Sequence, residues 1–313
     1  MSFAKTVKAE LVSVPVDLEE QLAEFSAFLN LQTELHLENK QKTFVFKTTN
    51  PTVAKRFLQL SRTLYQAETR LMTQKSTKLK RRPTVIIEIL SPVDKIMNEH
   101  NYLDHQTENQ ELFTQSIEAK KAYLRASFLA IGSVNHPKTA EYHLELFSTN
   151  PEQIVFIQKL MNHFHLNAKI TRRRKGYICY LKDAEGISDF LQLTGAQNSV
   201  FKFEDIRIKR DFNNSINRVI NCEIANEKKT LVTAQKQIKD IKLIESFIDK
   251  EDIDEKLLSV MSLRKDYPDI PLSELSEMYE SVYQEPLSKS GLNHRLTKIK
   301  QLAEQIRESR NIE

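Results

Sequence analysis

The sequence predicts an α+β protein with an internal duplication, followed by an all-helical domain. The order helix-strand-strand-helix-strand-strand-helix occurs twice, at an offset of about 99 residues. Beyond residue 230 only helical patterns remain, separated by Pro268, Pro271 and Pro286. The length of 313 residues suits two domains of roughly 150 residues each. We expect domains at 1–225, with halves at about 15–105 and 115–200, and at 226–313.

The first half follows from hydrophobic spacing and from proline positions. Leu22, Phe25 and Leu29 recur at helical spacing, and Phe44 and Phe46 alternate as in a strand. After a short helix at 3–11, we expect a helix at 18–31, strands at 33–37 and 43–47, a helix opened by Pro51, strands at 67–73 and 84–90, and a helix at 93–100.

The second half repeats this order. We expect a helix at 116–131, strands at 133–135 and 141–147, a helix opened by Pro151, strands at 168–171 and 177–181, and a helix at 184–193. A strand-like run at 200–209 and a polar helix at 213–224 follow. The helices expected in the second domain are 231–247, 255–267, 272–279 and 288–306.

Composition excludes several classes of function. The five glycines never fall into a dinucleotide-binding or phosphate-loop spacing, so no nucleotide cofactor is predicted. No apolar run approaches the roughly 18–20 residues of a membrane span, and the N-terminus carries no leader pattern. Cys179 and Cys222 form neither a disulfide framework nor a metal knuckle, and we expect both to be buried. We therefore expect a cytoplasmic protein with no cofactor, no metal and no membrane partner.

The C-terminal segment has the pattern of a helix-turn-helix. A short helix at 273–279, a turn at 280–286 and a second helix would place the start of that second helix at base edges in the major groove. No acidic residue occurs between Pro286 and Leu302, while Leu292, Leu296, Ile299 and Leu302 form an apolar stripe. Ser288 is the expected N-cap. The DNA-binding residues predicted here are Ser288, Lys289, Ser290, Asn293, His294, Arg295 and Lys298.

Two basic clusters occupy equivalent positions in the halves, between the third and fourth strands of each. If the halves pack with pseudo-twofold symmetry, both clusters lie on one side of a joined sheet and contact phosphates. The residues of the clusters are Lys78, Lys80, Arg81 and Arg82 in the first half, and Arg172, Arg173, Arg174 and Lys175 in the second.

Three motifs together resemble the WhiA family of transcription regulators from Gram-positive bacteria, which are associated with sporulation and cell division. The motifs are LSKSGLNHRL at 287–296, NRVINCEIAN at 217–226, and FLAIGSVN at 128–135 followed by YHLE at 142–145. The resemblance covers essentially the whole chain. It implies a degenerate fold similar to LAGLIDADG homing endonucleases, with an αββαββα order in each half, joined by a helical linker to a helix-turn-helix resembling region 4 of sigma factors.

The same resemblance bears on catalysis. In the nucleases the two motif helices pack through small residues, which would be Ala27 and Ala126 here. Each motif helix ends in an acidic residue that holds a divalent metal, and this sequence has Gln32 and Ile131 at those places. The chain also departs from the family at Thr33, where glycine is common. We therefore expect no nuclease activity.

Three functions are compatible with these features. The first is a sequence-specific regulator of sporulation or cell division that binds double-stranded DNA and is nucleoid-associated. The second is a metal-dependent nuclease with relocated acids such as Glu34. The third is an interaction protein that binds RNA polymerase or another transcription factor through its nuclease-like sheet and the acidic Glu274 and Glu277. No heptad pattern or cysteine pair indicates an oligomeric state.

Overall fold

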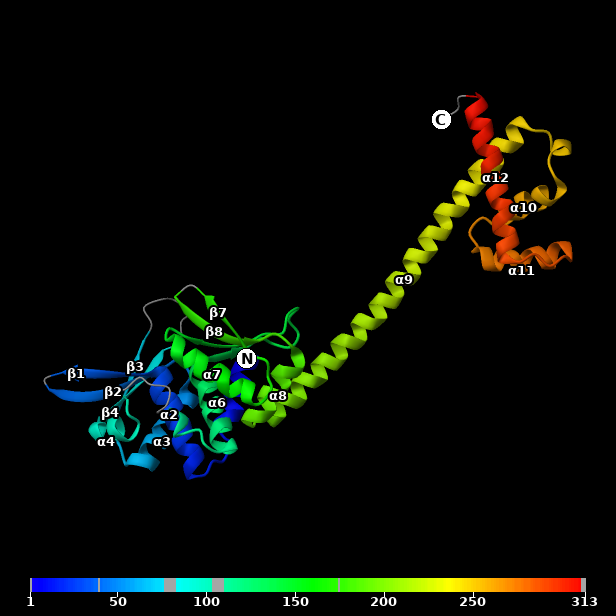
Figure 1. The fold of residues 1–313 in the computed structure, drawn as a ribbon. Coiled ribbons are helices and arrows are strands. Elements are labelled where there is room, and N and C mark those ends of the chain that lie inside the picture. Colours follow the sequence, from blue (N-terminus) through cyan, green and yellow to red (C-terminus); the bar gives the residue numbers. More distant parts are fainter. Residues whose placement is uncertain (1, 39, 76–82, 103–109, 174, 311–313) are drawn as a thin grey trace. The chain divides into compact units, whose positions relative to one another are not determined.

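The computed structural model describes residues 2–38, 40–75, 83–102, 110–173 and 175–310. The chain divides into two compact units, Met1–Asp211 and Phe212–Glu313 (Figure 1). Unit 1 is a mixed α+β structure with two antiparallel sheets, and unit 2 is helical, so the predicted fold class is confirmed. Within the described part of the chain, no helix is both long enough and apolar enough to cross a bilayer.

The first repeat of unit 1 contains the four-stranded sheet β1-β2-β4-β3. Its elements are α1 (Phe3–Leu11), α2 (Leu18–Gln32), β1 (Thr33–Glu38), β2 (Gln41–Thr48), α3 (Pro51–Tyr65), β3 (Glu68–Gln74), β4 (Thr84–Ser91) and α4 (Val93–Glu99). Local signals determine the helix starts. Asp17 and Glu20 form a capping box at α2, and Asn50 caps α3, whose first residue is the predicted Pro51.

The second repeat builds the matching sheet β5-β6-β8-β7. Its elements are α6 (Ile117–Ile131), β5 (Gly132–Val134), β6 (Leu144–Ser148), α7 (Pro151–His163), β7 (Lys169–Arg173), β8 (Gly176–Leu181) and α8 (Ala184–Thr194). Ser116, Asn150 and Asp183 cap the three helices through their side-chain oxygens. The same strand order in both sheets confirms the predicted duplication.

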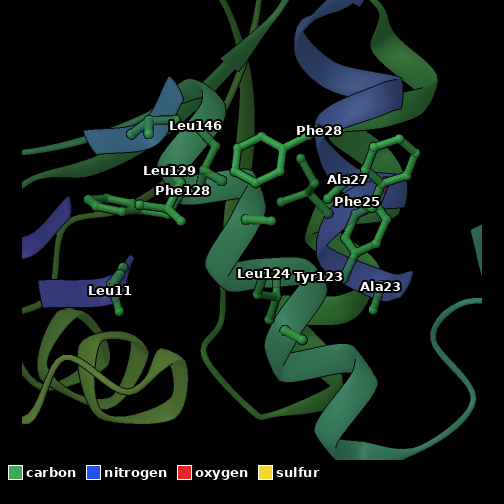
Figure 2. Packing of buried hydrophobic residues seen from close by; sticks show 14 of the residues in the cluster. Leu11, Ala23, Phe25, Ala27, Phe28, Tyr123, Leu124, Phe128, Leu129 and Leu146 are labelled. Atoms are coloured by element: carbon green, nitrogen blue, oxygen red, sulfur yellow. The ribbon is translucent and has the colours of Figure 1, made fainter. Parts of the chain in front are cut away.

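Helices α2 and α6 pack against each other at the centre of unit 1 (Figure 2). Ala27 and Ala126, which occupy equivalent positions in the two repeats, are both fully buried. Small side chains allow the two backbones to approach closely, and the rings of Phe25, Phe28 and Tyr123 fill the space around the crossing. One continuous hydrophobic core therefore includes residues of both repeats.

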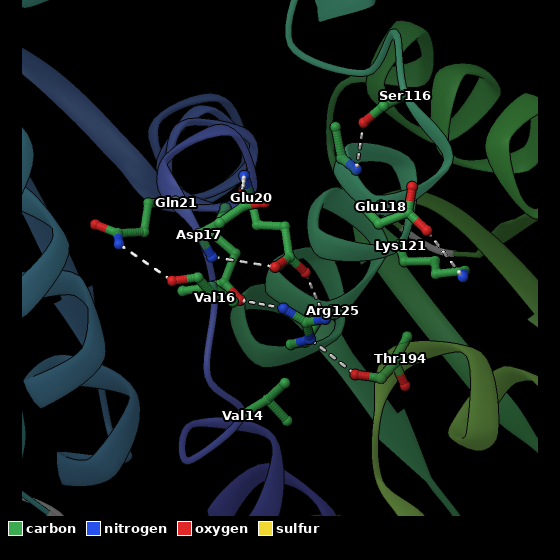
Figure 3. Close-up of polar contacts among 12 residues, drawn as sticks. Val14, Val16, Asp17, Glu20, Gln21, Ser116, Glu118, Lys121, Arg125 and Thr194 are labelled. Atoms are coloured by element: carbon green, nitrogen blue, oxygen red, sulfur yellow. Dashed lines mark hydrogen bonds and ion pairs between the residues drawn. The ribbon is translucent and has the colours of Figure 1, made fainter.

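A buried ionic network links α2 and α6, the helices that end at Gln32 and Ile131 and that are called the motif helices below. The Glu24 carboxylate accepts hydrogen bonds from Arg56 Nε at 2.8 Å and from Arg125 Nη1 at 2.9 Å. Arg125 also pairs with Glu20 at 3.3 Å and donates from Nε to the Thr194 carbonyl at 2.8 Å (Figure 3). Every charge of the network has a partner, as a buried ion requires.

Two expectations are wrong, the strand at 200–209 and the burial of Cys222. The segment 200–209 is not a strand but part of α9 (Gln197–Phe247), because the Glu10 carboxylate of α1 accepts hydrogen bonds from the Asn198 and Ser199 backbone N–H groups and so caps this helix. That contact spans almost 190 residues and leaves no local signal in the sequence. Cys179 is buried as expected, and burial raises its pKa to about 12, but Cys222 on α9 is exposed.

Helix α9 contributes to both units, with Phe203 buried in unit 1 and Ile241 and Ile244 buried in unit 2. The expected domain boundary at 225–226 therefore falls inside a helix. The other elements of unit 2 are a 3₁₀ turn at Lys250–Asp252, α10 (Glu255–Asp266), α11 (Leu272–Tyr283) and α12 (Lys289–Arg310).

Candidate nucleic-acid interface

Helices α11 and α12 form the predicted helix-turn-helix. Gln284 ends α11 in the left-handed conformation, with φ of 57°. Ser288 then begins α12: its carbonyl accepts from Leu292 N at 2.8 Å, and its side-chain oxygen accepts from Gly291 N at 3.2 Å. Ser276 Oγ donates to the Leu287 carbonyl and so ties the turn to α11. The start of α12 is thus held in place by both helices.

The loop between α10 and α11 is fixed by a buried arginine that the sequence did not point to. Arg264 is only 1 % exposed, and its Nη1 donates to the carbonyls of Tyr267 and Ile270 at 3.2 and 2.9 Å. Burial lowers the pKa of the guanidinium from its usual value. The side chain joins α10 to the loop that leads into α11, and so supports the orientation of the helix-turn-helix.

Helix α12 has one buried face and one exposed face. Leu292, Leu296 and Ile299 are buried as expected, while Leu302 is only half-buried. The chain adds Ala303 and Ile306 to this apolar stripe. The predicted DNA-binding residues that are exposed are Ser288, Lys289, Ser290, Asn293, His294 and Lys298. The structure therefore brings these six together at the start of one helix, where they are open to solvent.

Arg295 differs from the other predicted DNA-binding residues. It is half-buried, its guanidinium lies 5.3 Å from the centroid of the Tyr279 ring, and its Nη1 donates to the Tyr279 hydroxyl at 2.9 Å. A second, longer bond of 3.4 Å reaches the Lys256 carbonyl of α10. These contacts hold α10, α11 and α12 together through one nitrogen of the guanidinium, Nη1.

A cavity of about 430 Å³ lies beside α12 within unit 2, against the C-terminal part of α9. Four cations line it: Lys236, Lys239, Lys300 and Arg307. The single acid in the lining, Asp240, pairs with Arg307. Lys236 and Lys239 were missed at the level of sequence because only the folded helix α9 places them next to α12.

The basic clusters of unit 1 are described only in part. Lys78, Lys80, Arg81, Arg82 and Arg174 lie outside the described residues. Arg172 and Arg173, at the end of β7, and Lys175 are exposed. Arg173 Nη1 pairs with the Glu145 carboxylate of β6 at 2.7 Å, and His143 Nε2 lies 2.9 Å from the same oxygen. The charge of Arg173 is thus partly compensated, whereas no ion pair of Arg172 or Lys175 occurs with another described residue.

The ends of the motif helices do not form a metal site. Gln32 Nε2 donates to the Lys47 carbonyl at 2.7 Å, and the side chain of Ile131 has no atom that could ligate a metal. Glu34 pairs with Lys47 at 3.0 Å and with His36 at 3.2 Å, and hydrogen bonds from both hold its pKa below the usual value. Among the described residues, no three His, Cys, Asp or Glu side chains come together as ligands. These residues do not fit the divalent ions that a LAGLIDADG nuclease requires.

Family models match three successive parts of the chain. The WhiA N-terminal LAGLIDADG-like domain matches residues 18–103, the WhiA LAGLIDADG-like domain matches residues 120–213, and the WhiA C-terminal HTH domain matches residues 216–303.

Curated relatives match over nearly the whole length. A probable cell division protein WhiA from Enterococcus faecalis is 42 % identical over 311 residues, covering 98 % of this chain and 99 % of the relative. The Staphylococcus aureus protein of the same name is 42 % identical over 316 residues, with complete coverage of both chains. Among solved structures, full-length WhiA from Thermotoga maritima superposes with a TM-score of 0.59 at 25 % identity, covering 97 % of this chain and 99 % of that one.

Proposed function

The chain belongs to the WhiA family, and we propose that it is a transcription regulator of cell division or sporulation that binds specific sequences of double-stranded DNA. The observation that carries this proposal is the exposed face of α12. Ser290, Asn293 and His294 are open to solvent on a helix whose opposite face is buried, and no acid occurs between Pro286 and Leu302. An uncharged and basic helix face of this kind suits the major groove.

Base readout is assigned to Asn293 and His294, with Ser288, Lys289, Ser290 and Lys298 beside them. Arg295 is also assigned to this readout, and because it holds α12 on Tyr279 its removal affects the fold as well as DNA binding. The test is a fluorescence-anisotropy titration of promoter DNA with the Asn293→Ala/His294→Ala variant. We expect a loss of about 1–3 kcal/mol of discrimination per base contact, while binding to non-specific DNA changes little. Gln305→Ala, exposed on the same helix further along, is the matched control.

We assign phosphate contacts to the basic clusters of unit 1, which comprise Lys78, Lys80, Arg81, Arg82, Arg172, Arg173, Arg174 and Lys175. Two linked DNA-binding modules raise each other's effective concentration, so the full chain binds more tightly than either unit alone. In the same anisotropy titration, replacing Arg172 and Lys175 by Gln should weaken binding to all DNA sequences equally and lower its salt dependence.

The proposed regulator has no nuclease activity, because neither Gln32 nor Ile131 supplies the carboxylate that would hold a divalent ion, and Glu34 is engaged by Lys47 and His36. The check is incubation of the purified chain with supercoiled plasmid and Mg²⁺. Intact plasmid supports the proposal. Nicking that Glu34→Gln abolishes would support a relocated metal site instead.

RNA polymerase or another transcription factor is a further proposed partner, for which the exposed Glu274 and Glu277 of α11 offer an acidic surface. A pull-down after nuclease treatment, compared with the Glu274→Gln/Glu277→Gln variant, tests it. The proposed place of action is the cytoplasm, at the nucleoid.

A further inference from the structure

A cavity of about 410 Å³ lies where the two motif helices end. Gln32, the last residue of α2, and Ala130 and Gly132 at the end of α6 all line it, so both repeats contribute to its wall. The other lining residues come from the N-terminal segment and α1, from β2 and the turn after it, and from β4 and β5; among them are Lys5, Lys8, Lys47, Thr84 and Ser133. Ser2 and Thr49 are exposed, which shows that the cavity opens to solvent.

The lining of this cavity contains three lysines and no carboxylate. Lys47 is neutralised by Glu34 at 3.0 Å. Lys5 and Lys8 form no ion pair with any other described residue. Lys8 Nζ donates to the Leu129 carbonyl at 3.0 Å, near the C-terminal end of α6, and lies 5.6 Å from the centroid of the Phe128 ring. Burial lowers the pKa of Lys8 to about 8, so the amine is still mostly charged at neutral pH.

A mostly buried cation without a counter-ion is unfavourable unless something compensates its charge. The Leu129 carbonyl and the negative end of the α6 dipole supply part of this compensation. Further groups around the cavity that can donate to an anion are the hydroxyls of Thr84 and Ser133. Such a lining of cations and hydroxyls matches an anion with several acceptor oxygens.

We propose that this cavity, at the ends of α2 and α6, binds a phosphate group through the Lys5 and Lys8 ammonium groups. An ammonium group neutralises phosphate charge but does not polarise a bound water as a divalent ion does, so the site holds the group without cleaving it. The phosphate has two possible sources, the backbone of bound DNA or a free phosphorylated molecule. The first source rests on the proposed DNA-binding function, and the second does not.

To test whether the cavity binds a backbone phosphate of DNA, the full-length wild type is compared with the Lys5→Gln/Lys8→Met variant. Met keeps the apolar stem of Lys8, and Lys55→Gln, exposed on α3 outside the cavity, is the matched control. The dissociation constant for duplex DNA is measured between 50 and 200 mM salt. The slope of log K against log salt should fall in magnitude by about 1–2 in the double variant and stay unchanged in Lys55→Gln, since each phosphate contact contributes about 0.9.

Binding of a free phosphate is tested by comparing thermal melting in inorganic phosphate with melting in sodium chloride of equal ionic strength. If the wild type melts higher in phosphate and the double variant does not, the cavity takes a free phosphate. If a double variant that melts cooperatively shows neither a lower salt slope nor a lost response to phosphate, the inference is wrong. Should the double variant not fold, Lys5→Gln alone gives the same two readouts at about half the size. If the wild type binds no DNA, the proposed function is wrong, but the melting experiment would still show whether the cavity binds phosphate.

Discussion

Two regions of unit 1 differ in how their charged side chains are compensated. The first is the N-terminal half of α2, around Glu24, and the second is the C-terminal ends of α2 and α6, beside Lys8. Glu24 in the first region is 0 % exposed and accepts from Arg56 and Arg125 at 2.8 and 2.9 Å. Lys8, beside the second region, contacts a carbonyl and an aromatic ring but no described carboxylate. One region satisfies its charges within the chain, and the other leaves a net positive charge.

The difference separates a structural role from a binding role. A low local dielectric strengthens the Glu24 pairs and, in the same way, penalises an uncompensated ammonium group. The network around Glu24 has no capacity left for a ligand, whereas the cavity beside Lys8 has both unpaired charge and an opening. The following substitutions should therefore change stability in opposite directions at the two places.

The largest effect is expected at Glu24. Glu24→Gln keeps the shape of the side chain but leaves the buried Arg56 guanidinium without an ion-pair partner and Arg125 with Glu20 alone, which should lower the free energy of unfolding by about 3–5 kcal/mol. Urea unfolding followed by circular dichroism measures this loss. Glu111→Gln is the control, because the Glu111 carboxylate pairs with Lys159 at the surface and should contribute less than about 1 kcal/mol. Equal effects of the two substitutions would contradict the comparison.

His100 is the next largest case, a titratable group kept neutral by burial. Its Nε2 lies 2.8 Å from the Tyr65 hydroxyl. Its ring stacks on that of Phe113, with 4.4 Å between the ring centroids, and also contacts Phe25. Burial lowers the pKa of His100 to about 4. Since the unfolded chain takes up this proton near pH 6.5, the folded state loses stability as the pH falls from 6.5 to 4. The loss should reach about 3 kcal/mol.

Unfolding free energies measured across that pH range should show this slope in the wild type. His100→Gln should flatten the profile, while His163→Gln, at an exposed position on α7, should leave it unchanged. If the free energy of unfolding of His100→Gln still falls between pH 6.5 and 4, the titrating group is another residue.

Lys8→Met should act in the opposite direction to Glu24→Gln. Burial lowers the pKa of Lys8 from 10.5 to about 8, so at pH 7 the folded chain bears the cost of a charged amine, and Met should raise stability by about 1–2 kcal/mol. Between pH 8 and 10.5 the wild type gains stability as the amine loses its proton, and the advantage of the variant should shrink. Destabilisation by Lys8→Met at pH 7 would show that the ammonium group supports the fold instead.

Most of the fold could be predicted because its signals are local. Proline at the first turn of α3 and α7, hydrophobic spacing in α2 and the repeated element order are all visible in neighbouring residues. The strand expected at 200–209 was wrong because alternating Phe201 and Phe203 imitate a strand, while the contact that makes the segment helical comes from Glu10. A side chain so distant in sequence gives no periodic signal.

The candidate sites show the same limit. The exposed face of α12 follows from its apolar stripe, so Asn293 and His294 could be selected from the sequence. The engagement of Arg295 by Tyr279, the placement of Lys236 beside α12 and the lysine cavity at the ends of the motif helices all depend on tertiary contacts. Residues that become neighbours only in the folded chain share no spacing that a sequence pattern could reveal.

The smallest effect is expected at Thr33, where the ends of the two motif helices differ from each other. After α6 the chain turns at Gly132, whose N–H donates to the Phe128 carbonyl and where a Cβ would lie 2.7 Å from Phe128 Cα. After α2 the corresponding residue is the buried Thr33, whose hydroxyl donates to the Phe28 carbonyl at 3.1 Å.

The threonine hydroxyl therefore satisfies the end of α2, where the second repeat uses a glycine N–H. Thr33→Val keeps the shape but removes this donor, and should cost about 1 kcal/mol in urea unfolding, with Thr73→Val on exposed β3 as a neutral reference. The turn itself should survive, because the φ of −111° at Thr33 suits a β-branched residue. A loss as large as that of Glu24→Gln would mean that the hydroxyl, and not the backbone, defines the turn into β1.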